Sequence, residues 1–205
     1  MRQFLLFILF ALLPFTAIAQ CRYTNTWQDF LDGNWKTEEG QVELVPSAKE
    51  DCLALDVEAD KKKTAKMLRK TACVIEWGGS LYLNLRPFNT FGDVFVQAWR
   101  IGGDKVLFAR QDVAPSRFSI ANGDSGIPLS RSSFRSLSKL ENLVCYLAAW
   151  DPQREELRIA RVTAAIVAKF LTGHPAQLSQ YQQLERGQRE QADIVITTLQ
   201  AAGVI

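Results

Sequence analysis

A serine among small and acidic residues is the most specific chemical motif in the chain. Ser125 lies in Gly-Asp-Ser-Gly-Ile-Pro, residues 123–128. A serine hydroxyl becomes a nucleophile when a base lies within hydrogen-bonding distance, and histidine is the usual base. The chain contains one histidine, His174, which follows the serine after a long interval. His174 is therefore the only histidine that could serve as the base for Ser125.

The motif resembles the Gly-Asp-Ser-Gly-Gly-Pro sequence of chymotrypsin-like serine proteases, in which a histidine well before the serine is the base. Here Ile127 replaces a glycine of that motif, and no histidine precedes Ser125. Gly, Asp, Ser and Pro are also the residues that exposed turns select. We therefore interpret residues 123–128 as a turn, assign Ser125 no catalytic role, and assign His174 a structural role between two helices.

Carboxylates are the abundant catalytic groups of the chain. Glu38 and Glu39 lie beside Gly40, and Glu155 and Glu156 lie in a predicted hairpin turn, so all four are expected at the surface. A glycosidase needs two carboxylates that face each other across a cleft. Sequence spacing does not show such a pair, so a carboxylate-based hydrolase stays an alternative.

Cysteine usage permits disulfides without requiring them. The chain has four cysteines, which allow three pairings into two disulfides. Their spacing contains no paired metal-ligand motif, and with a single histidine we expect neither a metal site nor a cofactor. Cys145 shares strand parity with Leu143 and Leu147, so a buried free thiol fits it equally well. The disulfide candidates are Cys21, Cys52, Cys73 and Cys145.

The first 19 residues have the features of a secretory signal peptide. Arg2 precedes an apolar run at residues 4–13, and Ala17 and Ala19 form an A-x-A arrangement. That run is too short to span a bilayer, which takes roughly 20 residues, and we expect no transmembrane span in the mature chain. Gln20 precedes Cys21 where lipoprotein signals carry a small residue, so cleavage after Ala19 is favoured over lipid attachment at Cys21. The sequence thus predicts a periplasmic or secreted protein.

Charge and length limit the remaining possibilities. The formal net charge of +2 gives no electrostatic reason to expect nucleic acid as a partner. The one basic run, residues 60–71, has apolar residues at helical spacing, and we interpret it as a helix with a solvated face. We expect residues 20–205 to form a single α+β domain, mainly β with short helices over 20–162 and helical over 163–205.

Alternating apolar residues and turn signals predict an antiparallel sheet. Gly102 and Gly103 supply the positive backbone angles of a tight hairpin turn. One further hairpin is predicted before it in the chain and one after it. With the earlier strands this gives six to eight strands in one curved sheet or open barrel, followed by C-terminal helices. The predicted strands cover residues 41–45, 52–58, 72–77, 81–87, 93–100, 105–113, 143–150 and 157–162.

Helices are predicted near both ends of the mature chain. Thr26 is the expected cap of a short helix that ends at Gly33. Residues 163–171 form another, and Pro175 begins a longer helical stretch with a polar centre at Gly187. Its apolar residues make two stripes: Leu178, Tyr181 and Leu184, and then Ala192, Val195 and Leu199.

Three longer segments carry a family resemblance: LRKTACVIEWGGSLYLNLRPF, FGDVFVQAWRIGGDKVLFARQ and TAAIVAKFLTGHPAQLSQYQQLERGQ. Together they resemble a group of secreted Bacteroidetes proteins of the domain-of-unknown-function kind, from about Tyr23 onward. The resemblance implies a compartment, the cell envelope or the exterior of the cell. It implies no catalytic residue.

Three function classes follow. The favoured one is a noncatalytic binding or interaction module of the cell envelope, with an envelope protein, a glycan or a small apolar ligand as its partner. One alternative is a carboxylate-based hydrolase, although the sequence favours a noncatalytic protein over an enzyme. The other is a structural envelope component that docks through its C-terminal helices. Trp99 is the first binding candidate among the five tryptophans, and Tyr82, Arg86 and Arg100 accompany it, the two arginines as a polar patch.

Overall fold

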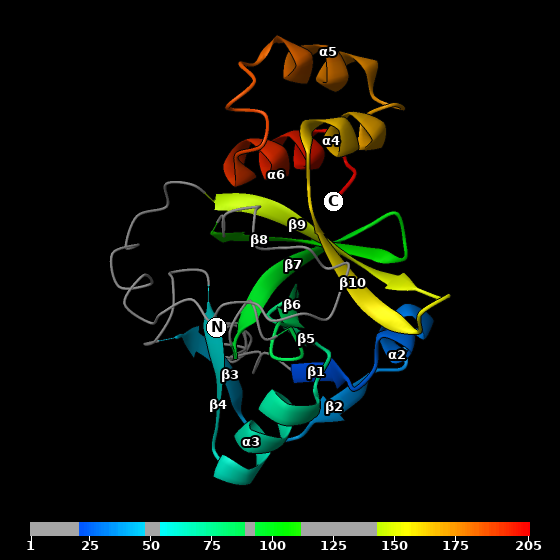
Figure 1. The fold of residues 1–205 in the computed structure, drawn as a ribbon. Coiled ribbons are helices and arrows are strands. Elements are labelled where there is room, and N and C mark those ends of the chain that lie inside the picture. The colour runs from blue at the N-terminus through cyan, green and yellow to red at the C-terminus, as the bar shows by residue number, and fades with distance from the viewer. Residues whose placement is uncertain (1–20, 48–53, 89–92, 112–142) are drawn as a thin grey trace, which may run out of the picture.

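The structure, a computed structural model, describes residues 21–47, 54–88, 93–111 and 143–205 (Figure 1). Over these ranges it has one large antiparallel sheet that does not close into a barrel, with helices on its surface. The predicted α+β class, with a curved antiparallel sheet and C-terminal helices, is confirmed. The signal peptide, Cys52 and Ser125 lie outside the described residues.

Ten strands of the described chain form this sheet. Its main path runs in the order β10-β9-β8-β7-β6-β5-β1-β2, and β3 and β4 form a hairpin that joins the path at β7. The strands are β1 (Cys21–Thr24), β2 (Lys36–Glu38), β3 (Val42–Pro46), β4 (Leu55–Ala59), β5 (Val74–Trp77), β6 (Ser80–Asn84), β7 (Phe95–Ile101), β8 (Lys105–Gln111), β9 (Leu143–Asp151) and β10 (Glu156–Arg161).

The predicted hairpins are present with the predicted turns. Gly102 and Gly103 have φ values of 63° and 85° in the turn between β7 and β8, a region that residues with a Cβ rarely adopt. The sequence pattern did not predict β1 and β2. Both are short: the four residues of β1, CRYT, are too few to establish an alternation, and β2, KTE, contains no apolar residue.

Local capping defines the first described helix, α2 (Trp27–Asp32). The Thr26 hydroxyl accepts a hydrogen bond from the backbone N–H of Asp29, and Gly33 ends the helix in the left-handed conformation. Both ends of this helix lie where the sequence predicted them. Its buried residues, Trp27 and Phe30, pack against one face of the sheet.

The second helix, α3 (Lys62–Thr71), packs with the β3–β4 hairpin. Its buried residues, Ala65 and Leu68, face the sheet, while its lysines are exposed. Arg69 donates to both carboxylate oxygens of Asp56 in β4, with N–O distances of 2.6 and 3.0 Å. This bidentate pair connects the helix to the strand.

The C-terminal helices are α4 (Ala164–Phe170), α5 (Pro175–Gln183) and α6 (Ala192–Ala201). The predicted long stretch from Pro175 is therefore two helices. Glu190, in the connection between them, accepts hydrogen bonds from the Arg161 guanidinium and from the backbone N–H of Ala164. Glu190 thus holds the α5–α6 connection against the end of β10 and the start of α4. No helix in the described ranges has the length and apolar content that crossing a membrane requires.

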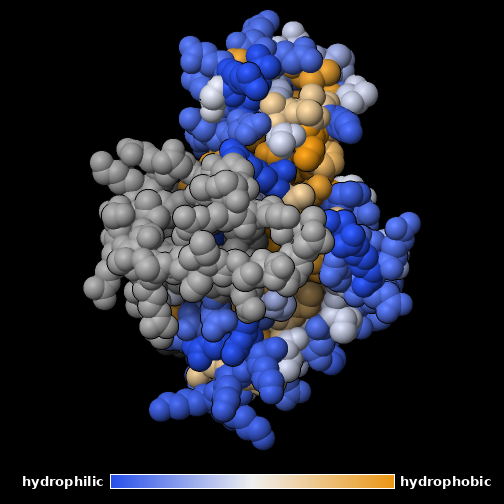
Figure 2. Space-filling view, viewed as in Figure 1, coloured by the Kyte–Doolittle hydropathy of each residue, from blue (hydrophilic) through white to orange (hydrophobic). Residues whose placement is uncertain are grey.

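The sheet buries two distinct surfaces. One face, with Leu83, Val96 and Phe108 among its residues, packs against α2 in a single apolar cluster. The opposite face is covered at one end by α4, α5 and α6 and at the other by α3 with β3 and β4. Figure 1 shows these two coverings at opposite ends of the molecule, and Figure 2 shows apolar side chains where the helical layer meets the sheet.

The strand β7 changes its neighbour between these two coverings. Along one edge it pairs with β8 from Ala98 to Ile101, whereas at Phe95 the same edge pairs with Leu55 of β4. Its other edge pairs with β6 throughout the overlap of the two strands. We call the point where β4 and β8 separate along β7 the fork.

Candidate functional site

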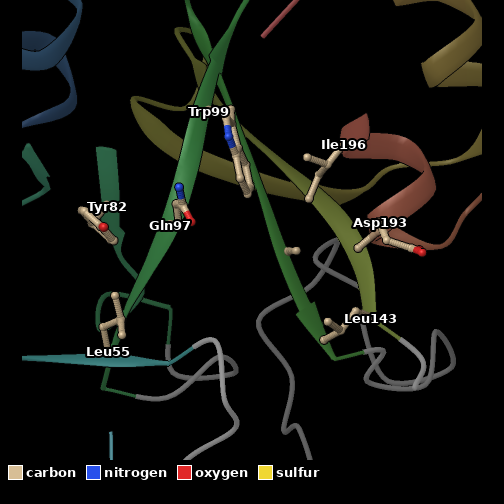
Figure 3. A pocket seen from close by; sticks show the side chains of 9 residues that line it. Leu55, Tyr82, Gln97, Trp99, Leu143, Asp193 and Ile196 are labelled. Atoms are coloured by element: carbon tan, nitrogen blue, oxygen red, sulfur yellow. The ribbon is translucent and has the colours of Figure 1, made fainter. Parts of the chain in front are cut away.

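A pocket of about 320 Å³ lies at the fork, on the face of the sheet that the C-terminal helices cover (Figure 3). This volume is at the lower end of the range of small-molecule sites, roughly 300–1,000 Å³. Residues from β4, β6, β7, β8, β9 and α6 surround it. The fork pocket is lined by Leu55, Tyr82, Gln97, Trp99, Ala109, Leu143, Ala192, Asp193 and Ile196.

The floor of the fork pocket comes from β6 and β7. Gln97 pairs directly with Tyr82 across these strands, so both side chains project from the same face of the sheet. Trp99 lies two residues after Gln97 and projects from that face as well. Tyr82 and Trp99 are half-buried and Gln97 is exposed, so all three remain accessible to a ligand.

The helix α6 forms one wall. Val195 and Leu199 are fully buried against the sheet, and Gln191, just before the helix, forms a β-bridge with Val144 of β9. These contacts fix the start of α6 over the start of β9. In Figure 3 the Ile196 side chain points from α6 toward Trp99.

The β4 strand forms the opposite wall through Leu55. This residue pairs with Phe95 of β7, and the next residue, Asp56, is the one that Arg69 of α3 binds. The Trp77 indole N–H also donates to the carbonyl of Val42 in β3, at 2.9 Å. The wall is therefore held by α3 on one side and by β5 on the other.

Three hydrogen-bonding groups in the fork pocket are available to a ligand. The Tyr82 hydroxyl, the Gln97 amide and the Trp99 indole N–H have no hydrogen-bond partner in the described part of the chain. Tyr82 makes one ring contact, with Trp77, at 6.4 Å between centroids. The site thus combines an apolar enclosure with a short row of donors and acceptors.

Formal charge is nearly absent from the lining. Asp193 is the one carboxylate among the described lining residues, and none of these residues is Lys, Arg or His. In Figure 3 the carboxylate of Asp193 points away from Trp99. The backbone and Cβ of Asp193, and not its carboxylate, therefore form this part of the wall. Asp193 lies in the first turn of α6, where a negative charge is favoured by the helix dipole.

Comparison with known proteins gives the family. The sequence profile described as "Family of unknown function (DUF6563)" matches residues 22–203. The chain belongs to this family. The matched range contains every residue that lines the fork pocket, so the pocket lies within the family domain. No curated protein and no solved structure gave a significant match.

Two of the four sequence-predicted binding residues of this family member lie together in the fork pocket, and two lie elsewhere. Trp99 and Tyr82 both line it. Arg100 projects from the opposite face, where its guanidinium lies 5.0 Å from the centroid of the Phe30 ring and donates to the carbonyl of Gly103. Arg86 lies 3.6 Å from the carboxylate of Asp93. The two arginines therefore have different partners.

The cysteines of the described chain have the environment of inert thiols. Cys21, Cys73 and Cys145 are free. Burial raises the pKa of Cys21 to about 11 and the pKa values of Cys73 and Cys145 to about 12. Because the thiolate is the nucleophile, none of these three groups suits a thiol–imidazole pair with His174.

The other sequence candidates are surface or structural groups. His174 precedes the first residue of α5, where its carbonyl accepts from the N–H of Leu178. Glu155 and Glu156 lie at the β9–β10 turn, and both are exposed. Among the described residues no three His, Cys, Asp or Glu side chains gather closely enough to hold a metal ion.

Several residues of the fork pocket carried no signal in the sequence. The alternation of β7 placed Gln97 on the same face as Trp99, but an exposed glutamine in a strand is unremarkable by itself. Leu55, Leu143 and Ile196 come from segments far apart in the chain, and none of them was a binding candidate from the sequence. Leu55 reaches the pocket through the pairing of β4 with β7, which the sequence alone does not show.

Proposed function

We propose that the protein is an exported, noncatalytic binding module of a Bacteroidetes cell envelope, and that the fork pocket is its small-molecule site. The observation that carries this proposal is the pocket itself, because it unites an apolar lining with three hydrogen-bonding groups that no described residue engages. Such a combination is typical of small-molecule sites, in which apolar contacts supply affinity and a few polar groups fix orientation.

Binding suits the fork pocket better than hydrolysis does. Acid–base hydrolysis by carboxylates requires two of them at the reacting bond. The described lining offers only Asp193, whose carboxylate points away from Trp99 (Figure 3). Binding requires no second carboxylate, so every described residue of the site is compatible with it.

Docking through the C-terminal helices is the weaker alternative because the sheet already occupies their apolar stripes. Tyr181, Ala192, Val195 and Leu199 are buried in the cluster that α4, α5 and α6 form with β7, β8 and β9. Leu178 and Leu184 pack against the same cluster. A partner protein would have to displace the protein's own sheet to reach these side chains.

Export is supported by the composition of residues 1–19, with Arg2 before an apolar run and small residues before the cleavage point. Cys21 is 1 % exposed in β1, which favours an unmodified thiol over a lipid anchor at this position. The resemblance to secreted Bacteroidetes proteins supports the same compartment. Intact mass of the protein purified from its host tests both points, since cleavage after Ala19 leaves Gln20 as the first residue.

The binding proposal is tested by filling the fork pocket. A fragment library of neutral, cationic and anionic molecules is screened by saturation-transfer NMR against the mature protein, and hits are retested on Ile196→Trp. The larger side chain at Ile196, which points toward Trp99, should remove the binding of most hits. The matched control is Gln200→Trp, which adds the same ring at an exposed position of α6.

Hits that bind the wild type and Gln200→Trp but not Ile196→Trp support the site. Equal binding to all three proteins, or the absence of any hit, contradicts it. Circular dichroism of each variant establishes that the fold is retained before the comparison is made.

A further inference from the structure

We infer that the fork pocket selects an uncharged amphipathic molecule, with an apolar end seated under α6 and a hydroxyl or amide end at Tyr82, Gln97 and Trp99. The inference rests on the proposed function, because it names the class of ligand that the same site takes. It follows from where the polar and apolar lining residues lie and from the absence of a facing charge among them.

The apolar end has its place between α6 and the sheet. Ile196 points from α6 toward Trp99 (Figure 3). Ala192, Ala109 and Leu143 line the pocket with it. Ala109 and Ala192 are 6 % and 2 % exposed. A methyl-, alkyl- or aryl-bearing group placed here would lose water contact on most of its surface, which is favourable in proportion to the apolar area buried.

The polar end has its place along β6 and β7. Tyr82 and Gln97 are directly paired, and paired side chains on one face lie about 4.5–5.5 Å apart at Cβ. In Figure 3 the Gln97 amide lies between Tyr82 and Trp99. A hydroxyl or amide of the ligand would meet an amide that both donates and accepts, with a phenol on one side and an indole N–H on the other.

Charge on the ligand would be unfavourable. An ion that leaves water for an apolar site must find an opposite charge or several hydrogen bonds. Among the described lining residues there is no cation, and the single carboxylate, Asp193, points away from Trp99 (Figure 3). Arg100, the residue after Trp99, is on the other face of β7, against Phe30. Neither an anion nor a cation would therefore gain a partner from the described lining residues.

The volume limits the ligand to a small molecule. The 320 Å³ of the fork pocket corresponds to about ten water molecules at their share of liquid volume, about 30 Å³ each. A monocyclic compound with one polar substituent fits within this volume. A longer ligand would extend past Gln97, which is exposed at the open side.

The experiment compares three probes that have one ring and nearly one shape. Benzyl alcohol is neutral, benzylamine is a cation and benzoate is an anion at pH 7. We expect benzyl alcohol to bind the mature protein about tenfold more tightly than either ion, as measured by NMR titration. Ile196→Trp should abolish this binding, and Trp150→Ala should retain it, because Trp150 is exposed and does not line the pocket.

A second comparison tests the polar end alone. Gln97→Leu should weaken the binding of benzyl alcohol by about 2–12-fold, the range of one lost hydrogen bond, and should leave the binding of toluene unchanged within about twofold. Gln97 is exposed, so this substitution leaves the core intact.

The outcomes separate the inference from the function on which it rests. Tighter binding of benzylamine or benzoate, or an equal effect of Gln97→Leu on benzyl alcohol and toluene, overturns the inference and leaves a ligand site in place. Binding of none of the probes, or binding that persists in Ile196→Trp, overturns the proposed function as well. A neutral preference that depends on both Gln97 and Ile196 supports both.

Discussion

At the scale of single residues, Asn84 holds together the parts of the molecule that flank the fork. Its side-chain amide donates to the carbonyls of Arg69 and Ala72, at 3.1 and 2.7 Å, and its oxygen accepts from the N–H of Arg86. Asn84 is 4 % exposed. It satisfies a carbonyl in the last turn of α3, which has no partner within the helix, and another just beyond it.

Replacement of Asn84 by alanine should lower the free energy of unfolding by about 1–3 kcal/mol, because it leaves buried carbonyls without their donor. Urea denaturation followed by circular dichroism measures the change. Asn34→Ala is the matched control, since Asn34 is exposed, and should stay within about 0.5 kcal/mol of the wild type. Equal stability of the two variants would contradict the role given to Asn84.

At the scale of elements, α3 has an unusual charge distribution at its start. Lys61 occupies the cap position and makes no side-chain cap hydrogen bond, and Lys62 and Lys63 follow it. The first turn contains no acidic residue. Positive charge near a helix N-terminus is opposed by the helix dipole, and lysine cannot accept from the free N–H groups there. The local sequence thus works against the helix, and packing of Leu68 and the Arg69–Asp56 pair retain it.

Lys61→Ser should stabilise the protein by about 0.5–1 kcal/mol, because serine accepts a hydrogen bond at the cap and removes one opposing charge. Thermal unfolding measures the effect. The same substitution at the other end, Lys70→Ser, should destabilise the protein, since Lys70 lies in the last turn where positive charge is favoured. Effects of the same sign at both ends would show that capping and dipole do not govern α3.

Elements with local signals were predictable, and those fixed by distant contacts were not. Thr26 and Gly33 determine α2 through bonds within the helix, so the sequence predicted both ends. Gly102 determines a turn through its own backbone angle. In contrast, the place of the α5–α6 connection against β10 and α4 involves the contacts of Glu190 with Arg161 and Ala164, which lie more than 20 residues away in the chain.

The same distinction applies to the candidate site. Tyr82 and Trp99, which the sequence proposed as binding residues, both line the fork pocket, because strand parity decides which face a side chain occupies. Parity does not say what covers a face, so Arg100 was grouped with Arg86, although it packs on Phe30 instead. The fork depends on Leu55 pairing with Phe95, a contact between distant segments.

At the scale of the whole molecule, buried thiols link stability to alkaline pH. Burial raises the pKa of Cys21 to about 11, and of Cys73 and Cys145 to about 12, from an ordinary value of 9.0. Below pH 9 these thiols keep their protons in both the folded and the unfolded chain, so their contribution is fully present. Above pH 9 the unfolded chain releases protons that the folded chain retains, so stability falls up to about pH 12.

Unfolding free energy should therefore decline as pH rises from 8.5 to 10.5, and Cys145→Ala should decline less steeply than the wild type. The difference between the two slopes is at most about 1.4 kcal/mol per pH unit, the value for one proton. Urea denaturation at a series of pH values gives the slopes independently of the cost of the substitution at neutral pH. Parallel slopes would mean that the Cys145 thiol titrates normally in the folded protein.

The central claim is that the fork pocket binds a small neutral ligand, and the indole N–H of Trp99 reports on it most directly. The measurement is a titration of the ¹⁵N-labelled mature protein with benzyl alcohol, with the indole signal of Trp99 assigned from Trp99→Phe. We predict that this signal shifts along a saturable curve while that of the exposed Trp150 stays in place. A Trp99 signal that does not move, or that moves no more than the signal of Trp150, would contradict the account.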